Sequence, residues 1–311
     1  MKVCSLSIDL DPIACYYAIH GLPEPAPSLG DVILRRGLPR FAEILERRKI
    51  QATLFVVGRD LEAERTTGRA LIGQMAAAGH EIANHSHRHP YAMARLDRPQ
   101  VDEEIGLAHD LITTVAGRPP VGFRAPGYDL SPTMLDALQA RGYRYDSSVF
   151  PAPLYWSAKA AVMGLMALSG RTSGAVLTSP KLLAAPTLPY RPNPSAPWRR
   201  GQSALVELPI TVSPWLRIPV IGTSLLLAPA VVRAQLLESL RTRPFFNLEL
   251  HGIDLIEAEQ DGIPAQLVAR QPDLRVPLIH KRRALEATLD RLAADYDFLP
   301  LRDYAAQVQR D

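Results

Sequence analysis

Three of the chain's eight histidines lie within five residues, at His85, His87 and His89. Imidazole side chains four residues apart can reach one ion from a helical turn or from a tight loop, and neutral imidazole suits zinc. A zinc site needs three or four ligands, so the cluster alone does not separate a metal site from a polar loop that is rich in histidine. A third ligand has to come from elsewhere in the chain.

Two carboxylates near the N-terminus can supply that ligand. Asp9 and Asp11 follow the apolar run at residues 3–8, and residues two apart on a strand point to the same face. Carboxylates at the end of a buried strand are costly unless they hydrogen-bond or coordinate a cation. An isolated Asp-x-Asp is more often a solvated junction between a strand and a loop. The pair therefore gains meaning only together with the histidines.

Two more polar residues stand at the ends of β-type runs. Arg124 ends the run at 121–124, and His251 ends the run at 245–251. Each residue by itself is weak evidence for an active site, because Arg-x-Pro is usually a turn and a lone histidine at a strand end is usually structural. Catalytic groups gather at the carboxyl ends of parallel strands in (β/α) barrels. Four such polar sites therefore indicate one shared active site.

The elements that would position these residues alternate between strand and helix. We expect a helix that starts at Ser131, where serine is the cap and proline the first helical residue, and that ends before Gly142. This rhythm predicts an α/β fold, either a (β/α) barrel or an open parallel sheet. The expected strands are 3–8, 52–57, 81–84, 121–124, 204–212 and 245–251, and the other expected helices are 38–48, 65–78, 102–115 and 285–295.

One segment interrupts the alternation. Residues 151–198 hold many of the prolines, an apolar helical piece at 156–168 and a coil-like stretch. We expect a single domain over residues 1–305, with an insertion at about 151–203 packed over one end of the scaffold, and a C-terminal tail at 306–311. The apolar insertion could contact a membrane or a lipid-linked substrate, or it could be a lid helix or a dimer contact.

Composition excludes several classes. With 311 residues, 47% hydrophobic and 22% charged, the chain is neither disordered nor collagen-like. A net charge of +3 leaves no electrostatic case for a nucleic-acid partner, and two cysteines are too few for a disulfide framework. The N-terminus becomes acidic at Asp9, before a signal-peptide core could form, so we expect a cytoplasmic protein.

The ordered set of motifs resembles the polysaccharide deacetylase family, also called the NodB homology domain or carbohydrate esterase family 4. The resemblance runs over residues 1–151 and resumes from 204 to about 305. The motifs that carry it are Ser-Ile-Asp-Leu-Asp at 7–11, Gly-His-Glu-Ile-Ala-Asn-His-Ser-His-Arg-His-Pro at 79–90, Phe-Arg-Ala-Pro-Gly-Tyr at 123–128, Tyr-Asp-Ser-Ser at 145–148 and Leu-Glu-Leu-His at 248–251.

The resemblance implies a distorted (β/α) barrel with one divalent metal, usually zinc. Asp11, His85 and His89 match the family's Asp-His-His metal ligands, and His87 lies outside this set. Zinc with three protein ligands keeps an open position for water and lowers the pKa of that water from about 15.7 toward roughly 7.

The resemblance also implies catalytic roles. Asp9 matches the general base, and Arg124 matches the arginine that orients this base. Tyr128 falls near the position whose backbone N–H helps to hold the oxyanion. His251 matches the general acid, and Asp146, in the fourth motif, is a loose match for the residue that orients it.

The implied reaction is removal of an N-acyl group, most simply acetyl, from an amino sugar that is small or lipid-linked. Leu10 separates the two aspartates that are adjacent in the commonest form of the first motif, and a branch that acts on amide-like substrates shares this spacing. One alternative is therefore a hydrolase of cyclic or other non-sugar amides. The other alternative is a catalytically silent carbohydrate-binding domain on the same fold.

Overall fold

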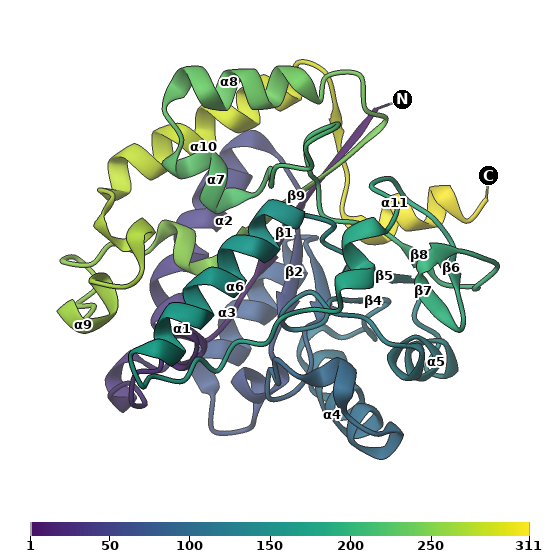
Figure 1. The fold of residues 1–311 in the computed structure, drawn as a ribbon, viewed down its shortest axis with the longest axis horizontal. Coiled ribbons are helices and arrows are strands. Elements are labelled where there is room, and N and C mark those ends of the chain that lie inside the picture. Colours follow the sequence, from purple (N-terminus) through teal and green to yellow (C-terminus); the bar gives the residue numbers. More distant parts are fainter. Residues whose placement is uncertain (1, 311) are drawn as a thin grey trace.

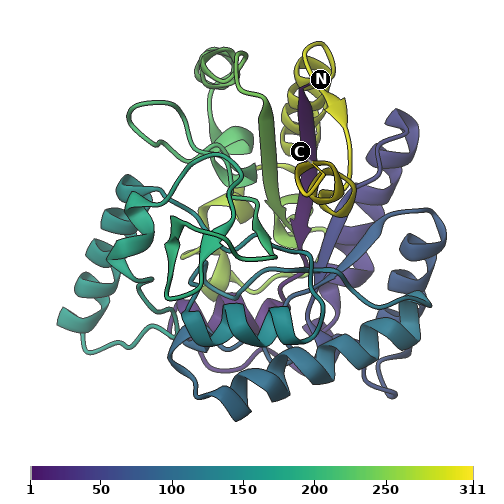
Figure 2. The same cartoon turned by 90° about the vertical axis from the view of Figure 1, so that its right-hand side faces the viewer.

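Strand β1 (Val3–Asp9) is the centre of the sheet, because it pairs with three other strands. It runs parallel to β9 (Phe245–His251) over its full length on one side, and Figure 2 shows this pair as the purple and green strands. On its other side it pairs with β10 (Asp297–Phe298) and then with β2 (Thr53–Val56). The computed structural model that shows this arrangement describes residues 2–310.

The remaining strands continue the parallel sheet from β2 and curl it toward β9. They are β3 (Glu81–Asn84), β4 (Gly122–Phe123), β5 (Tyr145–Asp146) and β8 (Val206–Glu207). Beyond β8, the N–H of Thr211 donates to the carbonyl of Asn247 at 3.3 Å, and the N–H of Asn247 donates to Oγ1 of Thr211 at 2.8 Å. These bonds link the two sides of the curled sheet, so the predicted distorted barrel is confirmed.

Helices surround the sheet (Figure 1). They are α1 (Ile13–Ile19), α2 (Leu38–Arg48), α3 (Thr66–Ala77), α4 (Arg98–Ala116), α5 (Pro132–Ala140), α6 (Pro153–Leu168), α7 (Gly222–Leu227), α8 (Ala230–Ser239), α9 (Ala265–Val268), α10 (Leu278–Ala293) and α11 (Leu301–Val308). Two begin earlier than the sequence predicted. Asp97 and Gln100 form a capping box that starts α4 at residue 98, and Pro277 directly precedes the start of α10 at 278.

The two faces of the central strands have different surroundings. On β1, Cys4, Leu6 and Ile8 pack into the core between sheet and helices, while the alternate residues face the inside of the barrel. The parallel register places Asp9 opposite His251. Polar side chains on this inner face are therefore carried toward the carboxyl end of the sheet.

The insertion contains the expected apolar helix, α6. It also contains an antiparallel pair, β6 (Pro192–Asn193) and β7 (Ala196–Arg200), within the stretch that we expected to be coil. In Figure 1, α6 lies on the near side, in front of β1 and β9. At the other end of the chain, α11 runs through the boundary that we expected at 305. Among residues 2–310, no helix combines the length and the apolar character needed to cross a bilayer.

Candidate active site

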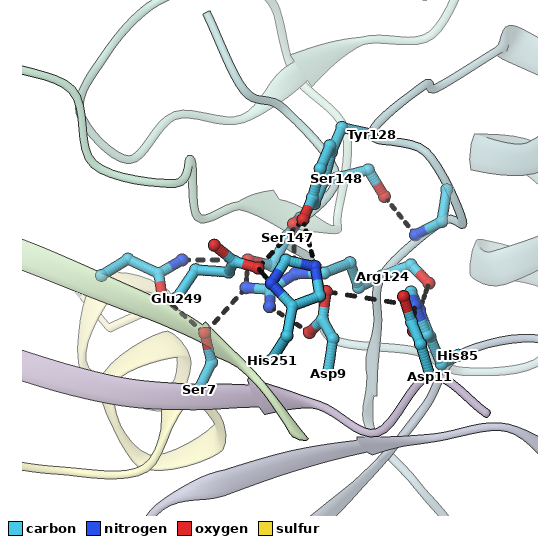
Figure 3. Close-up of polar contacts among 12 residues, drawn as sticks. Ser7, Asp9, Asp11, His85, Arg124, Tyr128, Ser147, Ser148, Glu249 and His251 are labelled. Atoms are coloured by element: carbon cyan, nitrogen blue, oxygen red, sulfur yellow. Dashed lines mark hydrogen bonds and ion pairs between the residues drawn. The ribbon is translucent and has the colours of Figure 1, made fainter. Parts of the chain in front are cut away.

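Three candidate metal ligands converge at the carboxyl ends of β1 and β3. Oδ1 of Asp11 lies 3.1 Å from Nε2 of His85, and Figure 3 shows this pair. The same oxygen lies 3.2 Å from Nε2 of His89, and all three side chains are buried. The histidines lie on a tight loop, not on a helix, in which Ser86 and His89 have positive φ angles of 64° and 60°. The Ser86 hydroxyl accepts the N–H of His89 at 3.1 Å and holds this turn.

The far ring nitrogen of each histidine is also held. Nδ1 of His85 donates to the carbonyl of Arg124 at 2.7 Å, and Nδ1 of His89 lies 3.4 Å from Sγ of Cys15. These contacts leave both Nε2 atoms facing Asp11, as in metal-bound histidines, whose second nitrogen is held by an outer partner.

The electrostatics also suit a cation. Burial by itself would raise the pKa of Asp11, but His89 and His85 outweigh it and hold that pKa well below its usual range. Oδ1 of Asp11 is buried and has no hydrogen-bond partner among residues 2–310. Two imidazole nitrogens and one ionised carboxylate are a donor set that zinc binds, so these residues fit a divalent metal.

Asp9 lies beside this site and is oriented by Arg124. Oδ1 of Asp9 accepts from Nη1 of Arg124 at 2.5 Å, while Oδ2 faces the ligands, 4.0 Å from Nε2 of His85. The guanidinium is fully buried, donates through Nε to the carbonyl of Ser147 at 2.9 Å, and stacks over Phe55 at 4.1 Å. Arg124 therefore fixes one oxygen of Asp9 and leaves the other free to face the metal ligands.

His251 forms a second cluster with Glu249 and Tyr128. Its Nδ1 lies 3.0 Å from Oε1 of Glu249, and its Nε2 lies 3.0 Å from the Tyr128 hydroxyl. That hydroxyl donates to Glu249 at 2.9 Å. Figure 3 shows these side chains next to Asp9.

The charges of this second cluster favour a protonated histidine. Burial alone would lower the pKa of His251, but the carboxylates of Glu249, Asp11 and Asp9 outweigh it and raise that pKa to about 9. Burial, with a contribution from Asp9, raises the pKa of Glu249 to about 7 despite the attraction of His251. The proton of the pair therefore resides on His251 at neutral pH.

Two residues lie elsewhere than the sequence analysis expected. Asp146 accepts from the hydroxyl of Ser148 at 2.7 Å and from its N–H at 3.0 Å, so it braces the loop after β5, and Glu249 is the carboxylate that contacts His251. The N–H of Tyr128 donates to the carbonyl of Ala125 at 3.2 Å, so it is the hydroxyl of Tyr128 that reaches into the site.

Sequence reasoning missed Glu249, although a signal for it existed. The run at 245–251 alternates so that Glu249 lies two residues before His251 and on the same face of the strand. His87, in contrast, was excluded from the ligand set, and its Nε2 lies 3.3 Å from Oε1 of Glu62, away from Asp11.

The two clusters open into one cavity of about 320 Å³. This volume is at the small end of the range for ligand sites, about 300–1,000 Å³. One wall belongs to the barrel, with Asp9, Asp11 and His251, and the opposite wall is apolar and comes from α6. The lining residues from α6 are Tyr155, Ala158, Lys159, Val162, Met163 and Met166.

Comparisons with known proteins agree with this geometry. Residues 30–145 match the polysaccharide deacetylase family model. A peptidoglycan deacetylase of Helicobacter pylori is 27% identical over 147 residues, which is 46% of this chain and 47% of the relative. The peptidoglycan deacetylase-like protein FGM2 of Gibberella zeae is 31% identical over 133 residues, 42% of this chain and 38% of the relative.

The chain thus spans less than half the length of these curated relatives. A solved structure from Pseudomonas aeruginosa, described as a probable polysaccharide deacetylase, has the same fold, with a TM-score of 0.59 and 16% identity over 99% of this chain and 91% of that one. The matched residues include the His85 to His89 loop and Arg124, which the fold brings together with Asp11. Over residues 30–145 the chain therefore matches the polysaccharide deacetylase family, and the arrangement of its site residues is similar to what that match implies.

Proposed function

We propose that the protein is a zinc-dependent hydrolase that removes an N-acyl group, in the first instance acetyl, from an amino sugar. The observation that carries this proposal is the convergence of Asp11, His85 and His89 on one point, beside a separate base, Asp9, and acid, His251, in one cavity. A bound divalent ion would lower the pKa of a coordinated water and polarise the acyl carbonyl.

Asp9 has the position of the general base. Oδ2 of Asp9 faces the ligand atoms and can accept the proton of an attacking water, while Oδ1 stays bonded to Arg124. The buried guanidinium keeps the carboxylate in one orientation, so little reorganisation is needed when the proton moves.

His251 has the position of the general acid. An amine is a poor leaving group unless it is protonated, and His251 carries a proton at neutral pH because its pKa is raised to about 9. Glu249 holds Nδ1, so the proton on Nε2 is the one that can pass to the amine. When no leaving group is present, the N–H at Nε2 of His251 donates to the hydroxyl oxygen of Tyr128.

The test measures metal content together with acid release. Purified wild-type protein is expected to hold about one zinc per chain and to release acetate, or formate, from members of a panel of N-acylated amino sugars. His89→Ala is expected to lose the metal and the activity. Asp9→Asn is expected to keep the metal and lose activity by about 10²- to 10⁴-fold, because only the base is removed.

Controls and contrary results separate the alternatives. His87→Ala is a matched control, since His87 lies in the same loop but faces Glu62. Metal binding without acid release from any sugar, together with hydrolysis of a cyclic amide, would replace the sugar substrate by a non-sugar amide. Absence of metal from the wild-type protein would support a catalytically silent domain instead.

A further inference from the structure

The outer side of α6 is apolar although it faces solvent. The helix has 16 residues and carries one charged side chain, Lys159. Leu154, Leu165 and Leu168 are 56%, 67% and 87% exposed. A surface helix of a globular protein normally places polar residues on this side, so packing within the chain does not explain the sequence of α6.

A neighbouring loop extends this apolar surface. Trp215 is 98% exposed, and Leu216 beside it is 68% exposed. The next residue, Arg217, donates to the carbonyl of Leu183, and Leu183 lines a small cavity together with Tyr155 and other residues of the first turn of α6. The loop therefore lies near the N-terminal end of α6. We call the exposed side chains of these two segments, Leu154, Leu165, Leu168, Trp215 and Leu216, the apolar face.

The sequence around the apolar face is strongly basic. Residues 147–237 contain eight Lys and Arg residues and one acidic residue, Glu207, which is buried. The rest of the chain has 27 basic and 31 acidic residues. The segment thus carries +7, whereas the remainder carries −4. The nearby carboxylate of Asp129 is turned inward and accepts the N–H groups of Leu130 and Ser179 at 3.1 and 3.3 Å.

We propose that the apolar face docks on the surface of an anionic lipid bilayer. Anionic headgroups complement the net charge of +7 on residues 147–237, because Lys and Arg residues near such a surface are attracted to it. Exposed leucines and a tryptophan suit the boundary between headgroups and acyl chains. At 16 residues α6 is shorter than the roughly 20 residues of a spanning helix, so it would lie in the interface and not cross it.

A second copy of the chain fits this face less well. A two-fold interface pairs the same patch with itself, so it would bring together two copies of the basic segment 147–237. Like charges brought together across an interface cost free energy, and residues 147–237 contain no exposed carboxylate that could compensate.

Docking also has a consequence for the substrate, which rests on the proposed function. The side of α6 next to the apolar face lines the active-site cavity with Tyr155, Met163 and Met166. One helix thus carries both the apolar face and a wall of the cavity, so a docked protein holds the mouth of the cavity close to the bilayer. An amido sugar attached to a lipid could then enter the site while its lipid stays in the membrane.

Vesicle flotation tests the docking independently of any hydrolysis. Wild-type protein is expected to float at least about tenfold better with phosphatidylcholine vesicles that contain about a third phosphatidylglycerol than with phosphatidylcholine alone. The double variant Leu165→Glu with Leu168→Glu is expected to lose about tenfold of this binding. In the wild-type protein, insertion of Trp215 should shift tryptophan emission to shorter wavelength.

The matched control is Ile279→Glu, which places the same charge at an exposed apolar residue of α10, outside the basic segment. It should bind vesicles like the wild type, and all variants should keep their bound metal and thermal stability. Absence of binding, equal binding to neutral and anionic vesicles, or binding that the double variant retains would overturn the proposal. So would a dimer that forms without lipid and dissociates in the double variant. Because flotation needs no substrate, failure of the sugar assay would leave the docking result intact.

Discussion

Glu249 and His251 illustrate how two side chains of ordinary type acquire a function from their surroundings. Both lie on the inner face of β9, where burial disfavours charge, and they contact each other at 3.0 Å. The imidazolium favours the ionised form of the carboxylate and so opposes the effect of burial on it, and the carboxylate in turn favours the protonated imidazole. A proton donor at neutral pH therefore depends on a carboxylate that need not touch the substrate.

We predict that Glu249→Gln lowers kcat by about tenfold and leaves KM and metal content unchanged, because Glu249 positions His251 and raises its pKa. A general acid must be protonated, so the wild-type rate should fall as the pH rises through about 9. Without the Glu249 carboxylate the pKa of His251 drops, and this falling limb moves to lower pH. The pH profile of kcat for wild type and variant measures the shift.

Glu207→Gln is the control for this variant. Glu207 is also fully buried, burial together with the nearby Asp146 raises its pKa well above the usual range, and it makes no contact with His251. Exchange for the isosteric amide should leave the pH profile in place. An unchanged profile in Glu249→Gln as well would show that Glu249 has only a structural role.

At the level of elements, the site depends on the pairing of β1 with β9. The register sets Asp9 opposite His251 and Ser7 opposite Glu249. A slip by one residue would turn each strand's inner side chains toward the helices, because side chains alternate between the faces. The packing of Leu6, Ile8, Leu248 and Leu250 against the helices fixes this register. The same packing therefore fixes the positions of the site residues on the inner face.

The side chain of Asn247 connects these strands to the far side of the barrel. Its Oδ1 accepts from Ser7 at 3.1 Å, and its Nδ2 donates to Ser147 at 3.0 Å and to the carbonyl of Leu208 at 3.1 Å. We predict that Asn247→Ala lowers the free energy of unfolding by about 2–3 kcal/mol, because buried polar partners lose their bonds. Urea unfolding of the metal-free protein measures the change.

Ser5→Ala is a control on the neighbouring strand. The hydroxyl of Ser5 is buried on the same inner face and has no hydrogen-bond partner among the residues that the structure describes. Its removal should be neutral or stabilising by up to about 1 kcal/mol. A loss as large as that of Asn247→Ala would mean that packing volume, and not the hydrogen-bond network, sets the stability of the barrel interior.

For the whole molecule, stability should depend on pH through His80. This side chain is buried in the turn between α3 and β3, and its Nδ1 accepts the N–H of Ala52 at 3.0 Å, which requires the neutral ring. Burial, with a smaller contribution from Arg302, lowers the pKa of His80 below 6.5. The folded protein therefore binds fewer protons at His80 than the unfolded chain does.

It follows that the contribution of His80 to stability is present above pH 6.5 and is lost as the pH falls below that value. The largest slope from one such group is about 1.4 kcal/mol per pH unit. We predict that His80→Asn, whose side-chain oxygen can accept the same N–H without titrating, reduces the slope between pH 7 and 5. The measurement is the free energy of unfolding between pH 7 and 5 for the wild type, His80→Asn and the exposed control His280→Asn. A slope that stays the same in His80→Asn would contradict the prediction.

Local patterns in the sequence predicted the α/β class, through alternating strand and helix runs and a serine cap at Ser131. The choice of a distorted barrel and of Asp11, His85 and His89 as candidate metal ligands came from the resemblance to a known family, since the local patterns left both open. Parallel strands end at one edge of a sheet, so residues at the ends of β1, β3, β4 and β9 had to meet once the sheet formed.

The contacts between residues on different strands of the barrel follow from tertiary packing. Asp146 and Glu249 are both carboxylates at strand positions, and nothing local to either residue says which one contacts His251. The choice follows from the full-length pairing of β9 with β1 and from the loop after β5, where Ser148 binds Asp146. The place of α6 over the cavity was likewise decided by packing, because its apolar sequence suits a buried core helix and an exposed one equally.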